Sequence, residues 1–196
     1  MAAHRAARSM VQRPFSPVLV AWLLCAMTWP VSASAGDVRA LQQRGRTLLA
    51  KGIDGSTTFK QLIDKIAESD VVVYLDLDPF DERKLDGALR FVGKAGGARF
   101  VKVWLRPRRI DDEMVVTLGH ELQHALEVAA DPQVVSQATF AAFCAKTGQS
   151  DKPGRFETRA AQQVALRIRA ELGRLRRGAE GVAGPMVACL VCRFGY

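Results

Sequence analysis

Residues 117–129 read TLGHELQHALEVA and form the centre of a longer segment, residues 110–130, in which apolar side chains recur at helical spacing. Asp111, Asp112 and Glu113 stand near its start, where acidic side chains favour the positive end of a helix dipole. We therefore expect one long helix over residues 110–130.

This predicted helix carries two of the three histidines of the chain, His120 and His124. A spacing of four residues places both imidazoles on one helical face, where they can bind a single metal ion. Glu121 then stands beside the ion and is the candidate general base that takes a proton from water. The opposite side of the helix is predicted to face the core through Met114, Leu118, Leu122, Ala125 and Ala129. The alternative is a pair of histidines on a solvated surface.

A catalytic zinc ion needs three protein ligands, so a third one must come from outside the histidine pair. Glu127 is one helical turn past His124, where it suits a partner of that histidine or a cleft wall better than a ligand. Asp131 would require the helix to break and fold back. We favour Glu157, which opens a predicted helix over residues 157–177, because the small Ala160 and Ala161 would let this helix approach the first. The alternative role of Glu157 is to complement its own helix dipole.

The rest of the chain predicts a single α+β domain over residues 36–196, with a small three-stranded sheet packed on the histidine helix. The composition is that of an ordinary globular protein, with 48% hydrophobic and 7% aromatic residues. The C-terminal tail over residues 177–196 has no clear assignment. The predicted strands are Val71–Leu75, Leu89–Val92 and Arg99–Leu105, the last two joined by a hairpin loop over Gly93–Gly97; the further predicted helices are Val38–Leu49, Thr58–Ala67, capped by Ser56, and Val134–Lys146.

Residues 1–35 have the pattern of a secretory signal peptide. Three arginines and no acid precede an apolar run over residues 18–29, and Ala33-Ser34-Ala35 is a small-residue cleavage site. The alternative is an uncleaved anchor, although the run is short for a membrane span. Removing this segment lowers the net charge from +8 to +5. We therefore expect a bacterial protein of the periplasm or the medium, with no nucleic-acid partner and no stable membrane span.

Three cysteines remain after the predicted cleavage, and two of them, Cys189 and Cys192, have C-x-x-C spacing. The context lacks the strand and helix of a thioredoxin-like site, and no second pair completes a zinc knuckle. A disulfide is the expected state in an oxidising compartment. Whether Cys144 pairs with either of them remains open.

The residues His120, Glu121, His124, Glu157 and Ala160 resemble the zincin metallopeptidases of the gluzincin type, whose third ligand is a glutamate on a later helix in an E-x-x-A pattern. The resemblance covers roughly residues 71–172. It implies a minimal zincin-like domain that binds Zn²⁺ and hydrolyses peptides or proteins.

In such folds an edge strand binds an extended peptide, and residues 99–105 are the candidate strand. The larger family members add a Tyr or His that stabilises the oxyanion. Tyr74 and Tyr196 stand in no matching motif, which leaves Arg159 or another arginine as the candidate. Trp104, at the end of a predicted strand, is expected in the core.

Three functions are compatible with this sequence. The first is an exported zinc peptidase with Glu121 as general base and His120, His124 and Glu157 as ligands. The second is a zinc-binding scaffold or partner-binding module of the same fold without activity. The third is a helical interaction protein in which the two histidines bind no metal.

Overall fold

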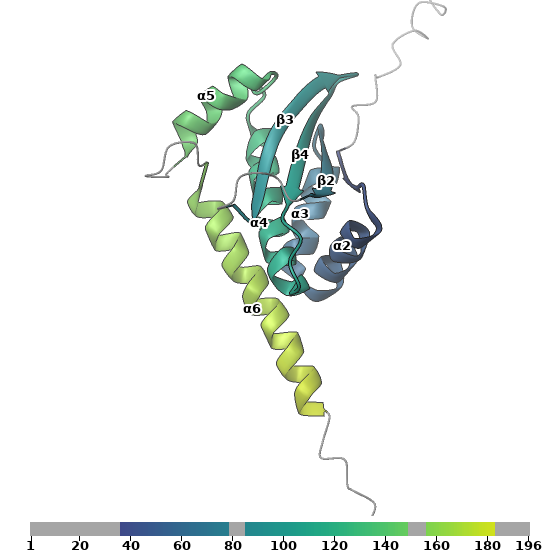
Figure 1. Ribbon diagram of the computed structural model, residues 1–196. Helices are drawn as coiled ribbons and strands as arrows, with labels where there is room; N and C mark the ends of the chain where they lie inside the picture. Colours follow the sequence, from purple (N-terminus) through teal and green to yellow (C-terminus); the bar gives the residue numbers. More distant parts are fainter. Residues whose placement is uncertain (1–35, 79–84, 149–155, 183–196) are drawn as a thin grey trace, which may run out of the picture. The chain divides into compact units, whose positions relative to one another are not determined.

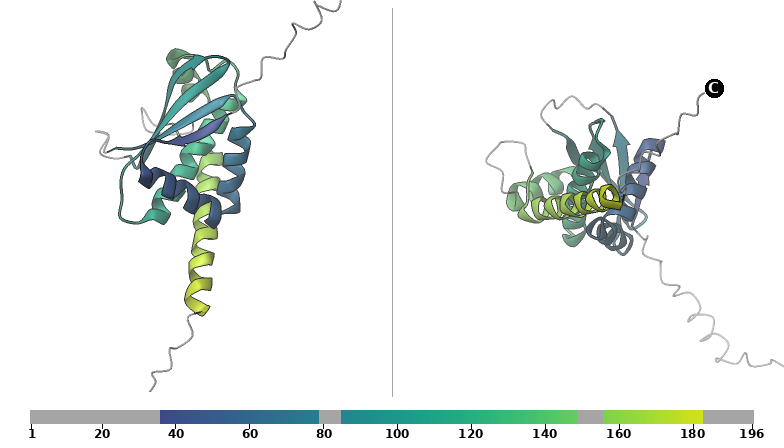
Figure 2. Two further views of the ribbon diagram at one scale, coloured as in Figure 1. Left: turned by 90° about the vertical axis from the view of Figure 1, so that its right-hand side faces the viewer. Right: turned by 90° about the horizontal axis from the view of Figure 1, so that it is seen from below.

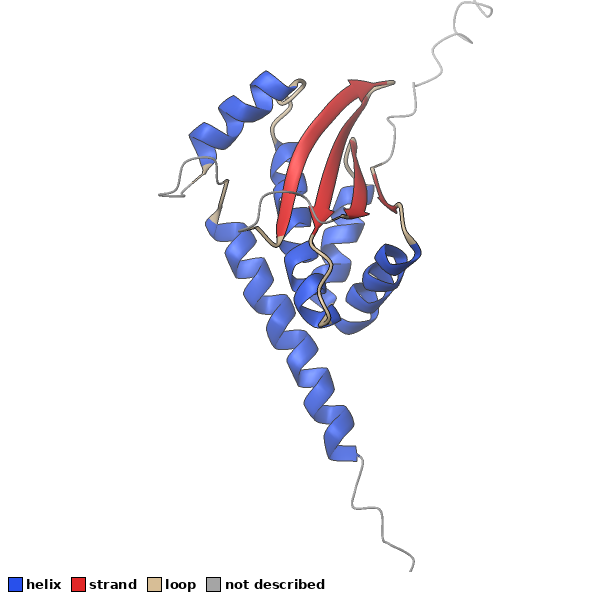
Figure 3. Ribbon diagram, viewed as in Figure 1, coloured by secondary structure: helices blue, strands red, loops and turns tan. Residues whose placement is uncertain are grey.

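A four-stranded mixed sheet forms one layer of the protein, in the strand order β1-β2-β4-β3 (Figures 1 and 3). The computed structural model describes residues 36–78, 85–148 and 156–182, and the side chains up to residue 178. The strands are β1 (Asp37–Ala40), β2 (Val71–Leu77), β3 (Gly87–Ala95) and β4 (Ala98–Leu105). β2 is parallel to both β1 and β4, whereas β3 and β4 form an antiparallel hairpin.

The α+β class is as predicted, but the sheet has four strands and not three. Residues 38–40, assigned by periodicity to a helix, belong to β1, where Val38 pairs with Val73 of β2. Gly36 allows this docking, since a Cβ there would lie 1.9 Å from the carbonyl oxygen of Ile66. Helix α2 (Gln43–Gly55) begins only after the strand. Pairing with β2, more than 30 residues away, decides that residues 37–40 form a strand, and the local spacing of apolar residues does not reveal this partner.

The hairpin between β3 and β4 is tighter than the predicted five-residue loop. Gly96 and Gly97, with φ of 57° and 86°, form its two-residue turn, and both strands extend to meet it. Positive φ at both central positions is the geometry that favours glycine in such turns. Gly93, placed in the predicted loop, lies inside β3, where the register shifts after Phe91.

The other helices are α3 (Thr57–Ala67), α4 (Asp111–Ala130), α5 (Gln137–Thr147) and α6 (Arg159–Val182). Within the described ranges, therefore, five helices accompany the sheet (Figures 1 and 2). Ser56 caps α3 as predicted, because its hydroxyl accepts a hydrogen bond from Phe59 N at 3.0 Å. α5 starts three residues later than predicted, since Ser136 caps it and Val134 precedes the cap.

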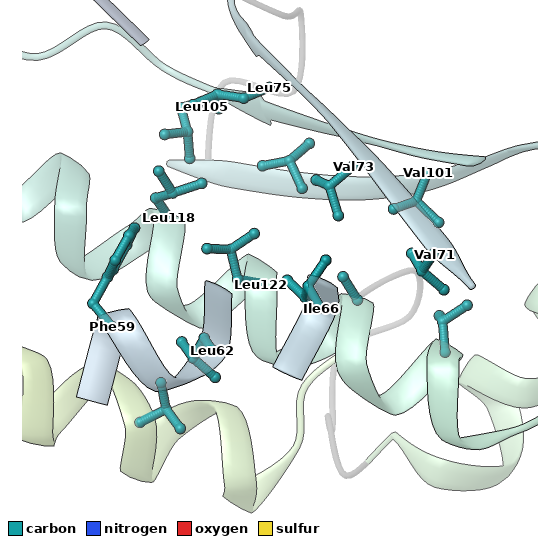
Figure 4. Packing of buried hydrophobic residues seen from close by; sticks show 14 of the residues in the cluster. Phe59, Leu62, Ile66, Val71, Val73, Leu75, Val101, Leu105, Leu118 and Leu122 are labelled. Atoms are coloured by element: carbon teal, nitrogen blue, oxygen red, sulfur yellow. The ribbon is translucent and has the colours of Figure 1, made fainter. Parts of the chain in front are cut away.

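The main core lies between the sheet and helices α3 and α4 (Figure 4). Leu118 and Leu122 of α4 are fully buried against the sheet, where Leu118 lies beneath Leu105, as the helical periodicity predicts. On another side α4 contacts α6 so closely that a Cβ on Gly119 would lie 2.2 Å from Ile168 Cδ1. α4 is therefore buried on more of its circumference than the two-sided periodicity predicts.

β4 is an inner strand, so the prediction of residues 99–105 as a peptide-binding edge is wrong; β1 and β3 are the edges. The side chain of Arg99 is instead buried in an ion pair with Asp70 at 2.6 Å. Its guanidinium also donates to the carbonyl oxygens of Val128, Ala129 and Asp131. These bonds hold the C-terminal end of α4 against the sheet.

Trp104 also differs from the prediction. Its ring is only partly buried, and Lys102 Nζ lies 4.6 Å from the ring centroid.

Residues 1–35 and the pair Cys189 and Cys192 lie outside the described residues. Among the described residues no helix combines the length and the apolar character needed to cross a membrane.

Candidate metal centre

His120 and His124 lie one turn apart on α4 with their imidazoles converging. Their Nε2 atoms are 3.1 Å apart, and the rings meet edge to face with centroids at 4.8 Å. His124 is 2% exposed, whereas His120 is partly exposed. Both rings line a cleft, so the predicted common face of the two histidines is present.

Glu157 joins the two histidines, as predicted, although not from within a helix. Its Oε1 lies 3.4 Å from His120 Nε2, and one ligand atom from each of His120, His124 and Glu157 lies within 4.8 Å of the others. α6 begins at Arg159, so Glu157 belongs to the segment before the helix. Of the two small residues expected to allow close approach, Ala161 is fully buried and Ala160 is exposed.

This three-residue cluster has the dimensions of a metal site. Zinc–nitrogen bonds of about 2.0–2.1 Å place two nitrogens on a tetrahedral ion roughly 3.3 Å apart, close to the observed separation of the histidine Nε2 atoms. Two imidazoles and one carboxylate also form the ligand set of a catalytic zinc site that keeps a fourth position open. The cluster therefore fits zinc or a similar divalent ion.

Burial keeps His120 in the neutral form that metal binding requires. It lowers the pKa of this imidazole to about 4, assisted by the neighbouring His124 and opposed by Glu127 and by a hydrogen bond with the Ala161 backbone. An imidazole with this pKa keeps its lone pair for a ligand at neutral pH.

Glu127 is the partner of His124, one of the two roles predicted for it. Its Oε2 lies 2.9 Å from His124 Nδ1, and its Oε1 accepts a hydrogen bond of 2.7 Å from Thr158 Oγ1. Burial would raise the pKa of Glu127, but hydrogen bonds with His124 and Thr158 outweigh it and lower the pKa. With a proton on Nδ1, His124 presents the lone pair of Nε2 to the cluster. Asp131, the other alternative ligand, ends α4 and lies outside the cluster.

Glu121 is buried beside the cluster and is 7% exposed. Burial, opposed by His124 and assisted by Glu157, raises the pKa of Glu121 to about 7. Gly87, at the start of β3, lies directly against it, since a Cβ there would be 2.9 Å from Glu121 Oε1. A carboxyl group with this pKa can both accept and release a proton near neutral pH.

The cleft beside the cluster has a volume of about 740 Å³. Residues of α4 line it together with the start of β3, one side of α5 and the first turns of α6. Much of the wall is apolar, as in Leu89, Phe140 and Phe156, and its arginines are Arg90 and Arg169. Arg159, the predicted oxyanion candidate, is exposed and is not among the residues that line the cleft. Tyr74 is also absent from the lining and stacks on Phe100.

Three contributors to the site were missed from the sequence. Gly87 and Phe156 are brought to it by the fold, and the Phe156 ring lies 4.5 Å from the ring of His124. Thr158 had a detectable signal, because a threonine before a helical segment is a typical N-cap. The segment was instead assigned to the helix itself.

In comparisons with known proteins, the chain matches no protein-family model, no curated protein and no solved structure.

Proposed function

We propose that this protein is a zinc-dependent peptidase, with His120, His124 and Glu157 as the metal ligands and Glu121 as general base. The observation that carries the proposal is the convergence of three ligand atoms within 4.8 Å, next to a buried glutamate and in an open cleft. The pattern in the N-terminal 35 residues supports an exported protein.

The chemistry divides between the metal and the protein. A bound zinc ion supplies Lewis acidity, which polarises the scissile carbonyl and makes water more acidic. Glu121 takes the proton of the attacking water as the new carbon–oxygen bond forms. It then gives that proton to the amine nitrogen as the carbon–nitrogen bond breaks. A pKa of about 7 suits a group that must act first as base and then as acid.

The substrate class that fits the cleft is an extended peptide. β3 is an edge strand, and residues 87–90 of it line the cleft. Such an edge binds a peptide through backbone hydrogen bonds. Gly87 would place this peptide next to Glu121, and the apolar walls around Phe140 and Phe156 would receive its side chains.

A second candidate function is a zinc-binding module without hydrolytic activity. The observation that favours it is the lining of the cleft, which contains no tyrosine and no third histidine among the described residues. An oxyanion would therefore depend on Arg90, Arg169 or backbone N–H groups. Partner binding through the same cleft needs no such donor.

Metal content and hydrolysis together test the proposal. Tag-free wild-type protein, Glu157→Ala and Glu121→Gln are compared by elemental mass spectrometry and by turnover of a broad peptide library. We expect one zinc per chain in the wild type and in Glu121→Gln, and a weakened site in Glu157→Ala. Hydrolysis should fall by a factor of about 10² or more in Glu121→Gln.

The outcomes separate the three functions. Full zinc occupancy without turnover would support the inactive module. Absence of zinc after reconstitution would support an interaction protein whose histidines bind no metal. Undiminished hydrolysis by Glu121→Gln would contradict the mechanism.

A further inference from the structure

The carboxylate of Glu127 connects the two parts of the chain that supply the cluster. One oxygen, Oε2, lies 2.9 Å from His124 Nδ1 on α4. The other, Oε1, accepts a 2.7 Å hydrogen bond from the hydroxyl of Thr158, the residue that follows Glu157. Glu127 belongs to the histidine helix α4, so its bond with Thr158 joins this helix to the segment carrying Glu157, and the same carboxylate also contacts His124.

Thr158 is 9% exposed and makes polar contacts through both its hydroxyl and its backbone. Its hydroxyl donates to Glu127 and also accepts from Ala161 N at 3.1 Å, which caps α6. A hydroxyl has one proton and two lone pairs, so both bonds can exist together. Its backbone N–H donates to Glu157 Oε1 at 3.2 Å. Thr158 therefore contacts the partner of His124 and also the candidate ligand Glu157.

These contacts fix the orientation of the His124 ring and of the Glu157 carboxylate, and metal affinity depends strongly on how such ligand groups are oriented. A histidine ligand is held in one tautomer and one ring orientation by the group bonded to its other nitrogen. Glu127 is the group bonded to the other nitrogen of His124, Nδ1, and the hydrogen bond from Thr158 fixes the position of Glu127. The bond between Thr158 N and Glu157 likewise restricts the carboxylate that must meet the same ion.

We propose that Thr158 is a positioning residue for the metal centre, acting on His124 through Glu127 and on Glu157 through its own backbone. This inference rests on the proposed metal binding. It predicts that the hydroxyl of Thr158 sets metal affinity beyond its contribution as a helix cap.

The test separates these two contributions with a matched cap variant. Thr158→Val keeps the shape of the side chain but removes the hydroxyl, and Thr158→Ser restores a hydroxyl. Ser136→Ala removes the side-chain cap of α5, in which the Ser136 hydroxyl accepts a hydrogen bond from Thr139 N. Zinc affinity is measured by competition with a chromophoric chelator, and the melting temperature of each zinc-free protein is recorded in parallel.

We expect Thr158→Val to weaken zinc binding by about 10- to 100-fold, the range typical for partners of metal ligands. Thr158→Ser should remain within a few-fold of the wild type. Ser136→Ala should lower the melting temperature of the zinc-free protein about as much as Thr158→Val, while its zinc affinity is unchanged. In the cobalt-substituted protein, the visible absorption bands should shift in Thr158→Val and not in Ser136→Ala.

Two results would overturn the inference, and they are distinguishable. Tight zinc binding by the wild type and equally by Thr158→Val would remove the positioning role and leave the metal site standing. Absence of zinc from the wild type would remove both. If Thr158→Val does not fold, Glu127→Gln provides the second variant, and unchanged zinc affinity there would also overturn the inference.

Discussion

Gly87 of β3 lies so close to Glu121 of α4 that a single methyl group on Gly87 would stand 2.9 Å from the carboxylate Oε1 and 2.8 Å from Thr117 Cγ2. The edge strand and the candidate general base are therefore in contact without a side chain between them. The φ of Gly87 is outside the left-handed region, so what glycine provides here is space for the Glu121 and Thr117 side chains.

Gly87→Ala should reduce hydrolysis while zinc is retained. The added methyl group displaces Glu121, and a shift of about 1 Å in a reacting group can cost about 10²-fold in rate. Gly93→Ala is the matched control in the same strand, because its Cβ would meet nothing within 4 Å. Turnover and zinc content are measured for both; equal turnover by the two variants would contradict a role for this contact.

Zinc should stabilise the folded protein through His120, His124 and Glu157. A ligand that binds only the folded state adds roughly 4 kcal/mol at 1,000 times its dissociation constant. Thermal unfolding with and without a chelator should show this increment in the wild type and in Glu121→Gln, which keeps the ligands. A much smaller increment is expected in Glu157→Ala, and an increment equal to that of the wild type would exclude Glu157 as a ligand.

Acid should weaken the fold through Asp70. The hydrogen bond from Arg99 lowers the pKa of this carboxyl group, and burial opposes the shift. Because the folded pKa is below the ordinary value of about 3.9, the stabilisation is complete above that value. It is lost as the pH falls through the folded pKa.

Asp70→Asn should lower the free energy of unfolding at pH 7 by about 1–3 kcal/mol and flatten its pH dependence below pH 4. Denaturant titrations at several pH values measure both effects. Asp64→Asn, which removes an exposed pair with Lys60, should change stability by less than about 0.5 kcal/mol. If the free energy of unfolding falls as steeply below pH 4 in Asp70→Asn as in the wild type, the pH dependence belongs to other groups.

Gly119→Ala should destabilise the protein although alanine favours a helix. Its Cβ would lie 2.2 Å from Cδ1 of the fully buried Ile168, and such overpacking costs about 1–3 kcal/mol. Ile168→Val removes that methyl group, so the double variant should recover part of the loss. Strictly additive effects in the double-mutant cycle would contradict direct contact between α4 and α6 at this point.

The sequence predicted the parts of this fold that depend on near neighbours. The span of α4, the glycine hairpin and the cap at Ser56 follow from acidic, glycine and hydroxyl residues in local patterns, and the structure confirms them. The convergence of Glu157 on the histidines was also predicted. That prediction depended on ligand chemistry, since a histidine pair is incomplete as a zinc site.

The parts that were missed depend on distant partners. β1 is a strand because it pairs with β2. The strand order places β3 at the edge of the sheet, although the residues of β3 and β4 suit an edge position equally well. Glu157 lies before α6 because Thr158 caps the helix, a choice between neighbouring residues that periodicity does not resolve. Gly87 reaches Glu121 only through the packing of β3 on α4.

The burial of α4 between the sheet and α6 has a consequence for how this protein can change by mutation. His124 and Glu121 are buried on the same helix as the fully buried Leu118 and Leu122, so substitutions that disrupt this helix also disrupt the centre of the core. Replacing the Glu121 carboxyl by an amide of the same size leaves that core filled. Loss of the proposed catalysis would thus take a short mutational step, whereas loss of the helix that carries the histidines would require rebuilding the domain.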